Sequence, residues 1–182
     1  LALPLPQGGQ LLFYIVEAPL MEPQLAAMHP GIKTYRGVAV EQPHITMRLT
    51  LTERGVYAMA LTSEGLLALE PMPGSFIPAT CLVYFDNRIP DTGFLCGVTD
   101  DRHRPLPGND YRGACGGNGG TLQTYRIAIA ATGELTTQYG GTTGATDFIV
   151  ASLSGITLIF ERELSVRLTL IAGNSSLIFS NP

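Results

Sequence analysis

Residues 44–52, HITMRLTLT, alternate strictly between apolar and polar side chains. A period of two is typical of a β-strand that buries one face and exposes the other to water. The turn residues ERG (53–55) follow this strand directly, and SEG (63–65) follow the next apolar stretch, residues 55–62. Turns that contain glycine at this spacing join neighbouring antiparallel strands. The pattern therefore predicts an antiparallel meander, in which residues 34–40 form another strand.

The segments around the meander extend the same β-rich domain. Residues 10–18, QLLFYIVEA, are rich in β-favouring side chains, and residues 75–87, SFIPATCLVYFDN, contain another apolar run. One short helix is expected between the first two strands, because Pro23 stands at a first-turn position before the helix formers 24–28. We expect residues 1–96 to fold as one mainly antiparallel β domain.

From residue 97 the sequence changes character. Residues 97–120, GVTDDRHRPLPGNDYRGACGGNGG, hold seven glycines and show no apolar periodicity. This composition predicts a linker or a long exposed loop. Residues 121–182 then show a strand, helix, strand order, so the predicted fold class is α+β: the β domain followed by a small α/β unit.

The pattern of the second unit is less regular than that of the first. Residues 122–132, LQTYRIAIAAT, predict a strand, and Thr146 or Asp147 is expected to cap the helix that follows. Four apolar residues then recur at helical spacing: Ile149, Leu153, Ile156 and Phe160. A strand at GITLIF (155–160) remains the alternative, because this stretch is rich in β-branched residues. A second strand is predicted in residues 165–174 and a short third one in residues 176–182.

The composition limits the class of partner. Only 14% of the residues are charged, against roughly 25% in an average soluble protein, and the net charge is -4. The Lys and Arg residues are scattered and form no basic stripe, which argues against nucleic acid as a partner. No run reaches the roughly 18 apolar residues of a membrane-spanning helix. The neutral, hydroxyl-rich composition and a start without Met favour a secreted, extracellular protein.

Several stretches resemble a known protease family. TYRIAIAATGEL (124–135), followed by GGTTGATDFIVASLSGITLIFERELSVRLTLIAGNSSLIFSNP (140–182), resembles the opening of the catalytic domain in secreted bacterial reprolysin-type zinc metalloproteases, which are metzincins. PLPQGGQLLFYIVEAPLMEPQLAAMHPGIKTYRGVAV (4–40) is similar to the pro-region of such precursors. The resemblance implies that residues 1–96 are pro-domain-like. It also implies that residues 121–182 begin a protease sheet with its first strand, helix and second strand.

The zinc-binding motif of that family does not occur in this sequence. Metzincins hold zinc with H-E-x-x-H-x-x-G-x-x-H, in which the Glu acts as general base. The histidines here, His29, His44 and His103, have no adjacent Glu, and no two are four residues apart. The chain ends at Pro182, before the family would reach the motif. We therefore assign no catalytic residue and no metal ligand to this chain, and zinc is expected only in the parent family.

Three cysteines leave several outcomes open. A disulfide can join two of Cys81, Cys96 and Cys115, and the sequence does not choose the pair. Cys96 ends the pro-like domain, so the resemblance gives it a second interpretation, as a thiolate that caps the catalytic zinc. A buried free thiol is the third interpretation.

Two charged stretches are candidates for processing or acid–base roles. Arg112, within the glycine-flanked DYRGACGG (110–117), is the candidate site for proteolytic release of a mature enzyme, and a solvated loop is the alternative. Glu161, Arg162 and Glu163 end the predicted helix, where we expect them to face solvent, with Arg162 complementing the helix dipole. No catalytic set of carboxylates or of Ser, His and Asp can be assembled.

Three functions remain open at this point. In the first, the chain is the non-catalytic part of a secreted zinc metalloprotease precursor, and its pro-domain chaperones and silences the downstream catalytic domain. In the second, it is an extracellular structural protein whose copies assemble into a filament or layer, because an incomplete protease sheet leaves an open edge. In the third, it is a stand-alone module that binds a protease. We expect the first.

Overall fold

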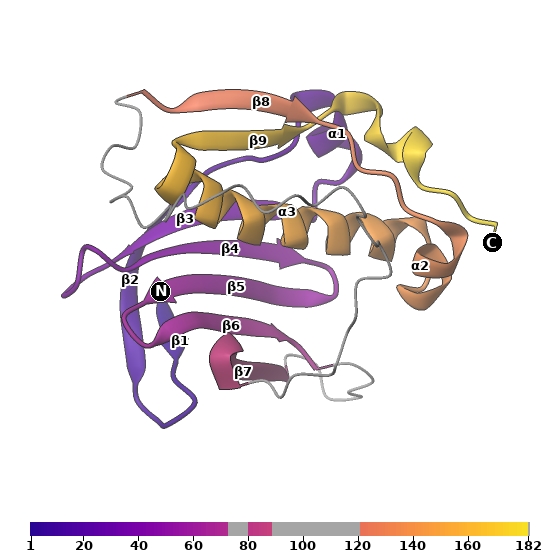
Figure 1. The fold of residues 1–182 in the computed structure, drawn as a ribbon. Helices are drawn as coiled ribbons and strands as arrows, with labels where there is room; N and C mark the ends of the chain where they lie inside the picture. The colour runs from indigo at the N-terminus through magenta and orange to yellow at the C-terminus, as the bar shows by residue number, and fades with distance from the viewer. Residues whose placement is uncertain (73–79, 89–120, 182) are drawn as a thin grey trace, which may run out of the picture.

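The structure is a computed structural model that describes residues 1–72, 80–88 and 121–181. Cys96, Cys115, Arg112 and His103 lie outside these residues, as does the predicted linker. Figure 1 shows three layers: a curved antiparallel sheet, a long helix that lies across it, and a small second sheet beyond the helix.

The first sheet is the predicted meander. Its seven strands follow one another in chain order and are all antiparallel: β1 (Ala2–Pro4), β2 (Gln10–Glu17), β3 (Lys33–Ala39), β4 (Thr46–Thr52), β5 (Gly55–Thr62), β6 (Gly65–Pro71) and β7 (Cys81–Phe85). Gly55 and Gly65 occupy the two predicted turns with φ of 136° and 130°, a region that favours glycine. A short 3-10 helix, η1 (Asp86–Arg88), follows β7. The mainly antiparallel prediction is confirmed.

The prediction that β4 exposes one face to water is wrong. Met47 and Leu49 are buried on one face, as expected, but Arg48 and Thr50 on the other face are also buried, with 2% and 1% of their surface exposed. The reason is that the long helix α3 (Thr142–Leu164) lies across β4 and β5 on that side. A strand that carries polar residues on its second face is thus covered on both faces.

The second unit has the predicted strand, helix, strand order with different boundaries. β8 (Gln123–Ile127) pairs in parallel with β9 (Val166–Leu170), and α3 connects them. Residues 155–160 are helical, so the strand alternative is wrong. The third strand is also wrong: a 3-10 helix, η2 (Ala172–Leu177), takes its place, and one bridge joins Ala131 to Ile178. A short helix that the sequence did not predict, α2 (Gly133–Gln138), precedes α3.

Helix α3 begins earlier than predicted. Its N-cap is Gly141, with φ of 113°, and Thr146 and Asp147 lie inside the helix as buried residues. Gly140 and Gly141 both adopt positive φ, and they form the turn that precedes the helix. The predicted N-cap, Thr146 or Asp147, would have put this turn several residues later. Thr146 and Asp147 are therefore buried within the helix instead of facing water at its end.

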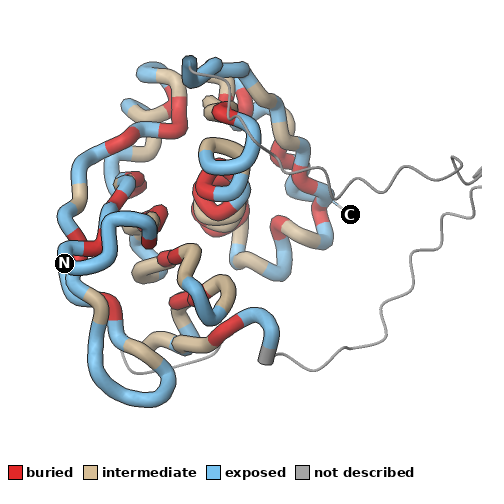
Figure 2. The backbone as a smooth tube through the Cα atoms, turned by 60° about the vertical axis from the view of Figure 1, so that its left-hand side comes forward, coloured by how far each residue is buried: buried red, intermediate tan, exposed pale blue. Residues whose placement is uncertain are grey.

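The buried apolar residues form two clusters. The first joins the strands of the large sheet, with Phe13, Met47, Leu67 and Phe85 among its members. The second joins α3, β9 and Ile178 to residues 20–32, which lie between β2 and β3 and include α1 (Pro23–Met28). Helix α1 starts at Pro23 as predicted. Figure 2 shows the buried positions of α3 in the middle of the molecule.

By length and composition, α3 would also suit a membrane span, which the sequence reading did not expect. It is the one helix in the described part of the chain with this property, and 61% of an apolar 18-residue stretch within it is buried inside the structure. Burial of this kind is also found in the core helices of folded domains.

Candidate functional site

Residues 20–22 continue the small sheet beyond β9. The amide of Leu170 donates to the carbonyl of Leu20 at 2.7 Å, and the amide of Glu22 donates to the carbonyl of Leu170 at 2.9 Å. Met21 and Leu170 form a parallel bridge. The strand β9 is therefore paired on both edges, by β8 on one side and by a segment from the N-terminal part of the chain on the other.

The side chains of the same segment fill the core of the second unit. Leu20 and Leu25 are fully buried, with 0% and 1% of their surface exposed. They belong to the cluster that contains Ile149, Leu153 and Leu170. Helix α1 has only six residues and no side-chain cap at its start. Because helices this short are marginal alone, α1 is held by this packing.

Glu22 fixes the segment electrostatically. Its carboxylate accepts hydrogen bonds from Arg126 Nε at 2.5 Å and from the amide of Ala172 at 2.7 Å. The Arg126 guanidinium first, and the Ala172 amide second, hold the pKa of Glu22 below its usual value. Arg126 belongs to β8 and Ala172 to η2, so one carboxylate joins residue 22 to two elements of the second unit.

The contact between α3 and the large sheet is of a different kind. It buries polar groups, and several of their atoms have no hydrogen-bond partner within the described residues: Arg48 Nε, Thr50 Oγ1, both carboxylate oxygens of Asp147, Ser154 Oγ and Thr157 Oγ1. Unpartnered buried polar atoms cost about 1–3 kcal/mol each. This contact is therefore weaker for its area than the two apolar cores on either side of it.

Glu161 lies at the centre of an ion-pair network, contrary to the prediction that it faces solvent. Its Oε1 accepts from Arg48 Nη2 and from Arg167 Nε, both at 2.5 Å. Glu163 remains exposed, as predicted, and pairs with Arg162 at 3.3 Å. Glu161 lies on the face of α3 that meets β4 and β9, whereas Glu163 lies on the outer face. Burial lowers the pKa of Arg48, and the bond to Glu161 opposes that effect.

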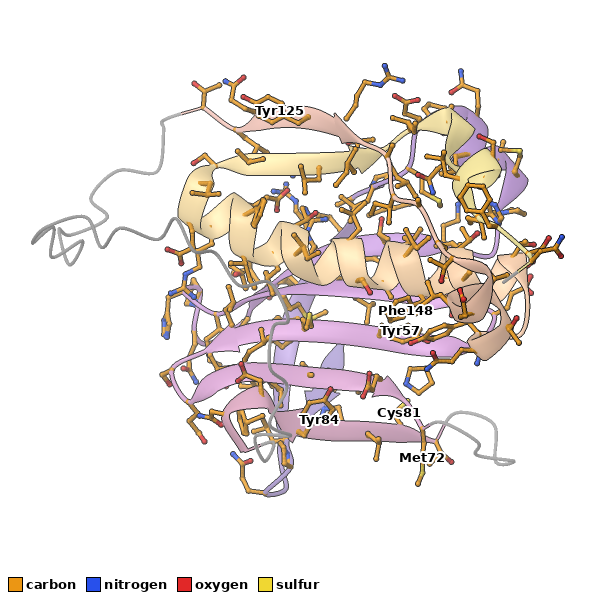
Figure 3. All side chains as sticks on the ribbon, turned by 45° about the vertical axis from the view of Figure 1, so that its right-hand side comes forward. Tyr57, Met72, Cys81, Tyr84, Tyr125 and Phe148 are labelled. Carbon is orange, nitrogen blue, oxygen red and sulfur yellow. The ribbon has the colours of Figure 1, made fainter. Side chains whose placement is uncertain are left out.

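A groove of about 820 Å³ opens beside this contact, between α3 and the strands β5, β6 and β7. Aromatic and apolar side chains line much of it, among them Tyr57, Met59, Tyr84, Tyr139 and Phe148. Figure 3 shows Tyr57 and Phe148 close together at one end, with Tyr84 on the strand at the far edge of the sheet. The groove is thus a continuation of the polar contact, on the side where α3 no longer covers the sheet.

The candidate site residues from the sequence are not brought together. Cys81 begins β7 and is half-buried; it makes no disulfide within the described residues, and both possible partners lie outside them. His29 caps the end of α1, and His44 lies in the turn before β4. In residues 1–72, 80–88 and 121–181, no three His, Cys, Asp or Glu side chains gather as metal ligands.

The residues that do form the contact were missed by sequence reasoning. Arg48 reads as the solvent-facing member of an alternating strand, and Glu22 as a polar residue before a helix. A single signal was available: Asp147 is the one carboxylate between Glu134 and Glu161, inside a stretch that is otherwise apolar, small or hydroxyl-bearing. An isolated carboxylate in such a stretch indicates a buried or functional residue. The sequence analysis instead interpreted Asp147 as a helix N-cap.

One comparison with known proteins matches part of the chain. Residues 121–182 match the model of a family described as metallo-peptidase family M12B, reprolysin-like. Neither the curated proteins nor the solved structures give a match. The M12B family is zinc-dependent. The matched residues are those of β8, α2, α3, β9 and η2, which share a core with residues 20–32. Residues 121–182 therefore form a region similar to the reprolysin-like metallopeptidases.

Proposed function

We propose that residues 1–96 act as a pro-domain, which folds and silences a metallopeptidase region that begins at residue 121. One observation carries the proposal: residues 18–32 supply a strand contact and core side chains to the reprolysin-like region. A pro-domain that contributes part of the core makes folding of its client dependent on it. In this proposal the protein is part of a secreted zinc protease precursor, and its partner is its own downstream catalytic domain.

The open edge of β8 supports a larger sheet. Among the described residues β8 pairs only with β9, and most of its residues are exposed. Figure 3 shows Tyr125 on this outer strand. Parallel strands normally belong to larger sheets that are covered on both faces. We infer that another strand adds to the outer edge of β8, and polypeptide that follows residue 182 is the simplest source.

Hydrogen exchange on the intact protein tests the proposal. The amides of Glu22 and Leu170 bond across the contact, so they report whether residues 18–32 and the reprolysin-like region open together. We expect both amides to exchange with the same free energy of opening as the core amide of Leu153 in α3. Rapid exchange at Glu22 and Leu170, with Leu153 still protected, would show that the region keeps its fold without the segment.

A second function, assembly of copies, is favoured by an exposed apolar surface. Tyr14 is 73% exposed, and Leu12, Val16 and Val38 are each more than 40% exposed. These side chains lie on the outer face of β2 and β3, where Tyr14 pairs with Val38 across the strands. Contiguous apolar patches of this kind mark interaction sites or aggregation-prone surfaces. Contact with a second copy of the chain would cover these apolar side chains. A filament or layer requires such contacts between copies.

Light scattering over a range of protein concentrations tests this second function. If copies assemble through the patch, the apparent mass of the wild type rises with concentration and Tyr14→Lys stays at 19.4 kDa. Met28→Lys is the matched control, since Met28 is also exposed but belongs to α1, which packs in the second cluster. A wild type that remains at the mass of one chain at every concentration excludes assembly through this surface.

A further inference from the structure

The polar contact between α3 and the large sheet separates the two apolar cores. On the sheet side it presents Arg48 and Thr50 of β4, and on the helix side Asp147, Ser154 and Thr157. All five residues are at most 2% exposed. A contact made of buried polar groups is sensitive to their protonation, because an ion without a partner is far more costly to bury than a neutral group.

Asp147 is the titratable group that this contact leaves unpartnered. It belongs to the second turn of α3, it is 1% exposed, and neither carboxylate oxygen has a hydrogen-bond partner among the described residues. The charged groups that act on its carboxylate are Glu53 and Arg54, in the turn between β4 and β5. Burial first, and the charge of Asp147 to a smaller extent, raise the pKa of Tyr57 of β5, against an opposite effect of Arg54.

The neighbouring groups do not neutralise the Asp147 carboxylate. Arg54 uses its Nη1 to donate to the carbonyl of Tyr139 at 2.6 Å, and its guanidinium lies over the Tyr139 ring at 5.9 Å from the ring centre. Glu53 has the same sign of charge as Asp147. Glu70 and Tyr139 are the other titratable groups near Tyr57, and neither is a cation. The surroundings therefore favour the protonated, neutral form of Asp147.

We propose that the contact between α3 and the large sheet is a pH-sensitive joint: it is tight while Asp147 carries a proton, and it loosens when Asp147 ionises. The contact that residues 20–25 make with β9 and α3 does not loosen as the pH rises, since apolar packing and main-chain hydrogen bonds make most of it. A rise in pH therefore separates α3 from the large sheet before it separates residues 20–25 from β9 and α3. The pH-sensitive contact is inferred from the geometry alone. Its role as the first step in the release of a protease region rests on the proposed function.

The direction of the pH effect follows from the pKa. Burial first, and the charge of Glu53 second, raise the pKa of Asp147 from 3.8 to about 6, against a smaller opposite effect of Arg54. A raised pKa means that the folded protein holds a proton that the unfolded chain releases. The resulting stability is complete below the unfolded pKa and is lost as the pH rises through the folded one. Over the full interval the folding equilibrium weakens by roughly 100-fold.

Glu22 has the opposite dependence, which separates the two effects. Its pKa is lowered, so the stability that it contributes is present above its usual pKa and is lost only as the pH falls through the lowered value. Asp147 acts between about pH 4 and pH 7, and Glu22 acts in more acid solution. The difference between the wild type and Asp147→Asn cancels every group that titrates alike in both proteins.

The test compares the full chain with Asp147→Asn and with Glu163→Gln, which neutralises an exposed carboxylate of the same helix. Denaturant unfolding is measured from pH 4.5 to pH 7.5. We expect the folding equilibrium constant of the wild type and of Glu163→Gln to fall roughly 20-fold more than that of Asp147→Asn. Parallel curves for the wild type and Asp147→Asn would overturn the proposal. Asp147→Ala serves as the second variant if Asp147→Asn does not fold.

A methyl group at the joint reports its opening directly. Met59 of β5 packs against Gly155 of α3, where any Cβ would collide with the Met59 sulfur. We expect the Met59 methyl NMR signal of the wild type to move towards its solvent-exposed position as the pH rises through 6, and that of Asp147→Asn to stay. A Met59 signal that does not move in the wild type overturns the proposal without any variant.

The two proposals fail separately. Independent exchange at Glu22 and Leu170, with a protected Leu153, removes the pro-domain function but leaves the titration of Asp147 untouched. An unmoved Met59 methyl removes the pH-sensitive joint but leaves the role of residues 18–32 in the core of the reprolysin-like region.

Discussion

Glu161→Ala lowers the free energy of unfolding by about 3–5 kcal/mol, because it leaves the buried Arg48 guanidinium without its carboxylate. The Arg48 side chain is 1% exposed, so water cannot replace the lost partner. Arg167, which shares the same carboxylate oxygen, is left unpaired as well. Urea unfolding at neutral pH measures the change.

The matched control for this prediction is Glu163→Ala, two residues further along α3. Its carboxylate is 53% exposed and pairs with Arg162, and exposed pairs contribute at most about 1 kcal/mol. The double variant Arg48→Met with Glu161→Leu recovers most of the loss, because apolar groups of similar size need no partner. Equal losses for Glu161→Ala and Glu163→Ala would show that the network does not hold the sheet to α3.

Leu25→Ala lowers the free energy of unfolding by about 2–5 kcal/mol, the usual range for a leucine truncated in a core. The location of the loss matters more than its size. Leu25 is in the N-terminal part of the chain, but it packs in the cluster of α3, β9 and Ile178. We therefore expect faster hydrogen exchange in residues 121–181, which hydrogen exchange read by mass spectrometry resolves. In the large sheet the protection should change less.

Met28→Ala is the control for Leu25→Ala, since it changes the same helix at a side chain that is 56% exposed. A substitution there changes the stability by less than about 0.5 kcal/mol. If Leu25→Ala weakened the protection of the large sheet and spared residues 121–181, residues 18–32 would belong energetically to the sheet alone, and the pro-domain proposal would lose its support.

The sequence predicted the parts of the fold that depend on local pattern. The alternation in β4 and the turn glycines Gly55 and Gly65 are enough to specify the meander, because strand period and turn chemistry are local properties. Pro23 likewise marked the start of α1. The order of β8, α3 and β9 was also predictable, although not the residue at which α3 begins.

The contacts between distant segments could not be predicted in this way. Arg48 and Glu161 are 113 residues apart, and each looks like a surface residue within its own element. Whether the second face of β4 is wet depends on α3, which no pattern within β4 reveals. Asp147 was read as a cap because caps and buried acids use the same residue type, and the turn at Gly140 and Gly141 decided between them.

The intact mass and the native particle size of the protein from its natural source test the pro-domain role most directly. The account predicts a chain heavier than 19.4 kDa, or this chain bound to a separate fragment that contains zinc. A chain of 19.4 kDa in large regular assemblies would contradict the account. It would leave the likeness to reprolysin-like metallopeptidases as a matter of ancestry, and self-assembly as the function.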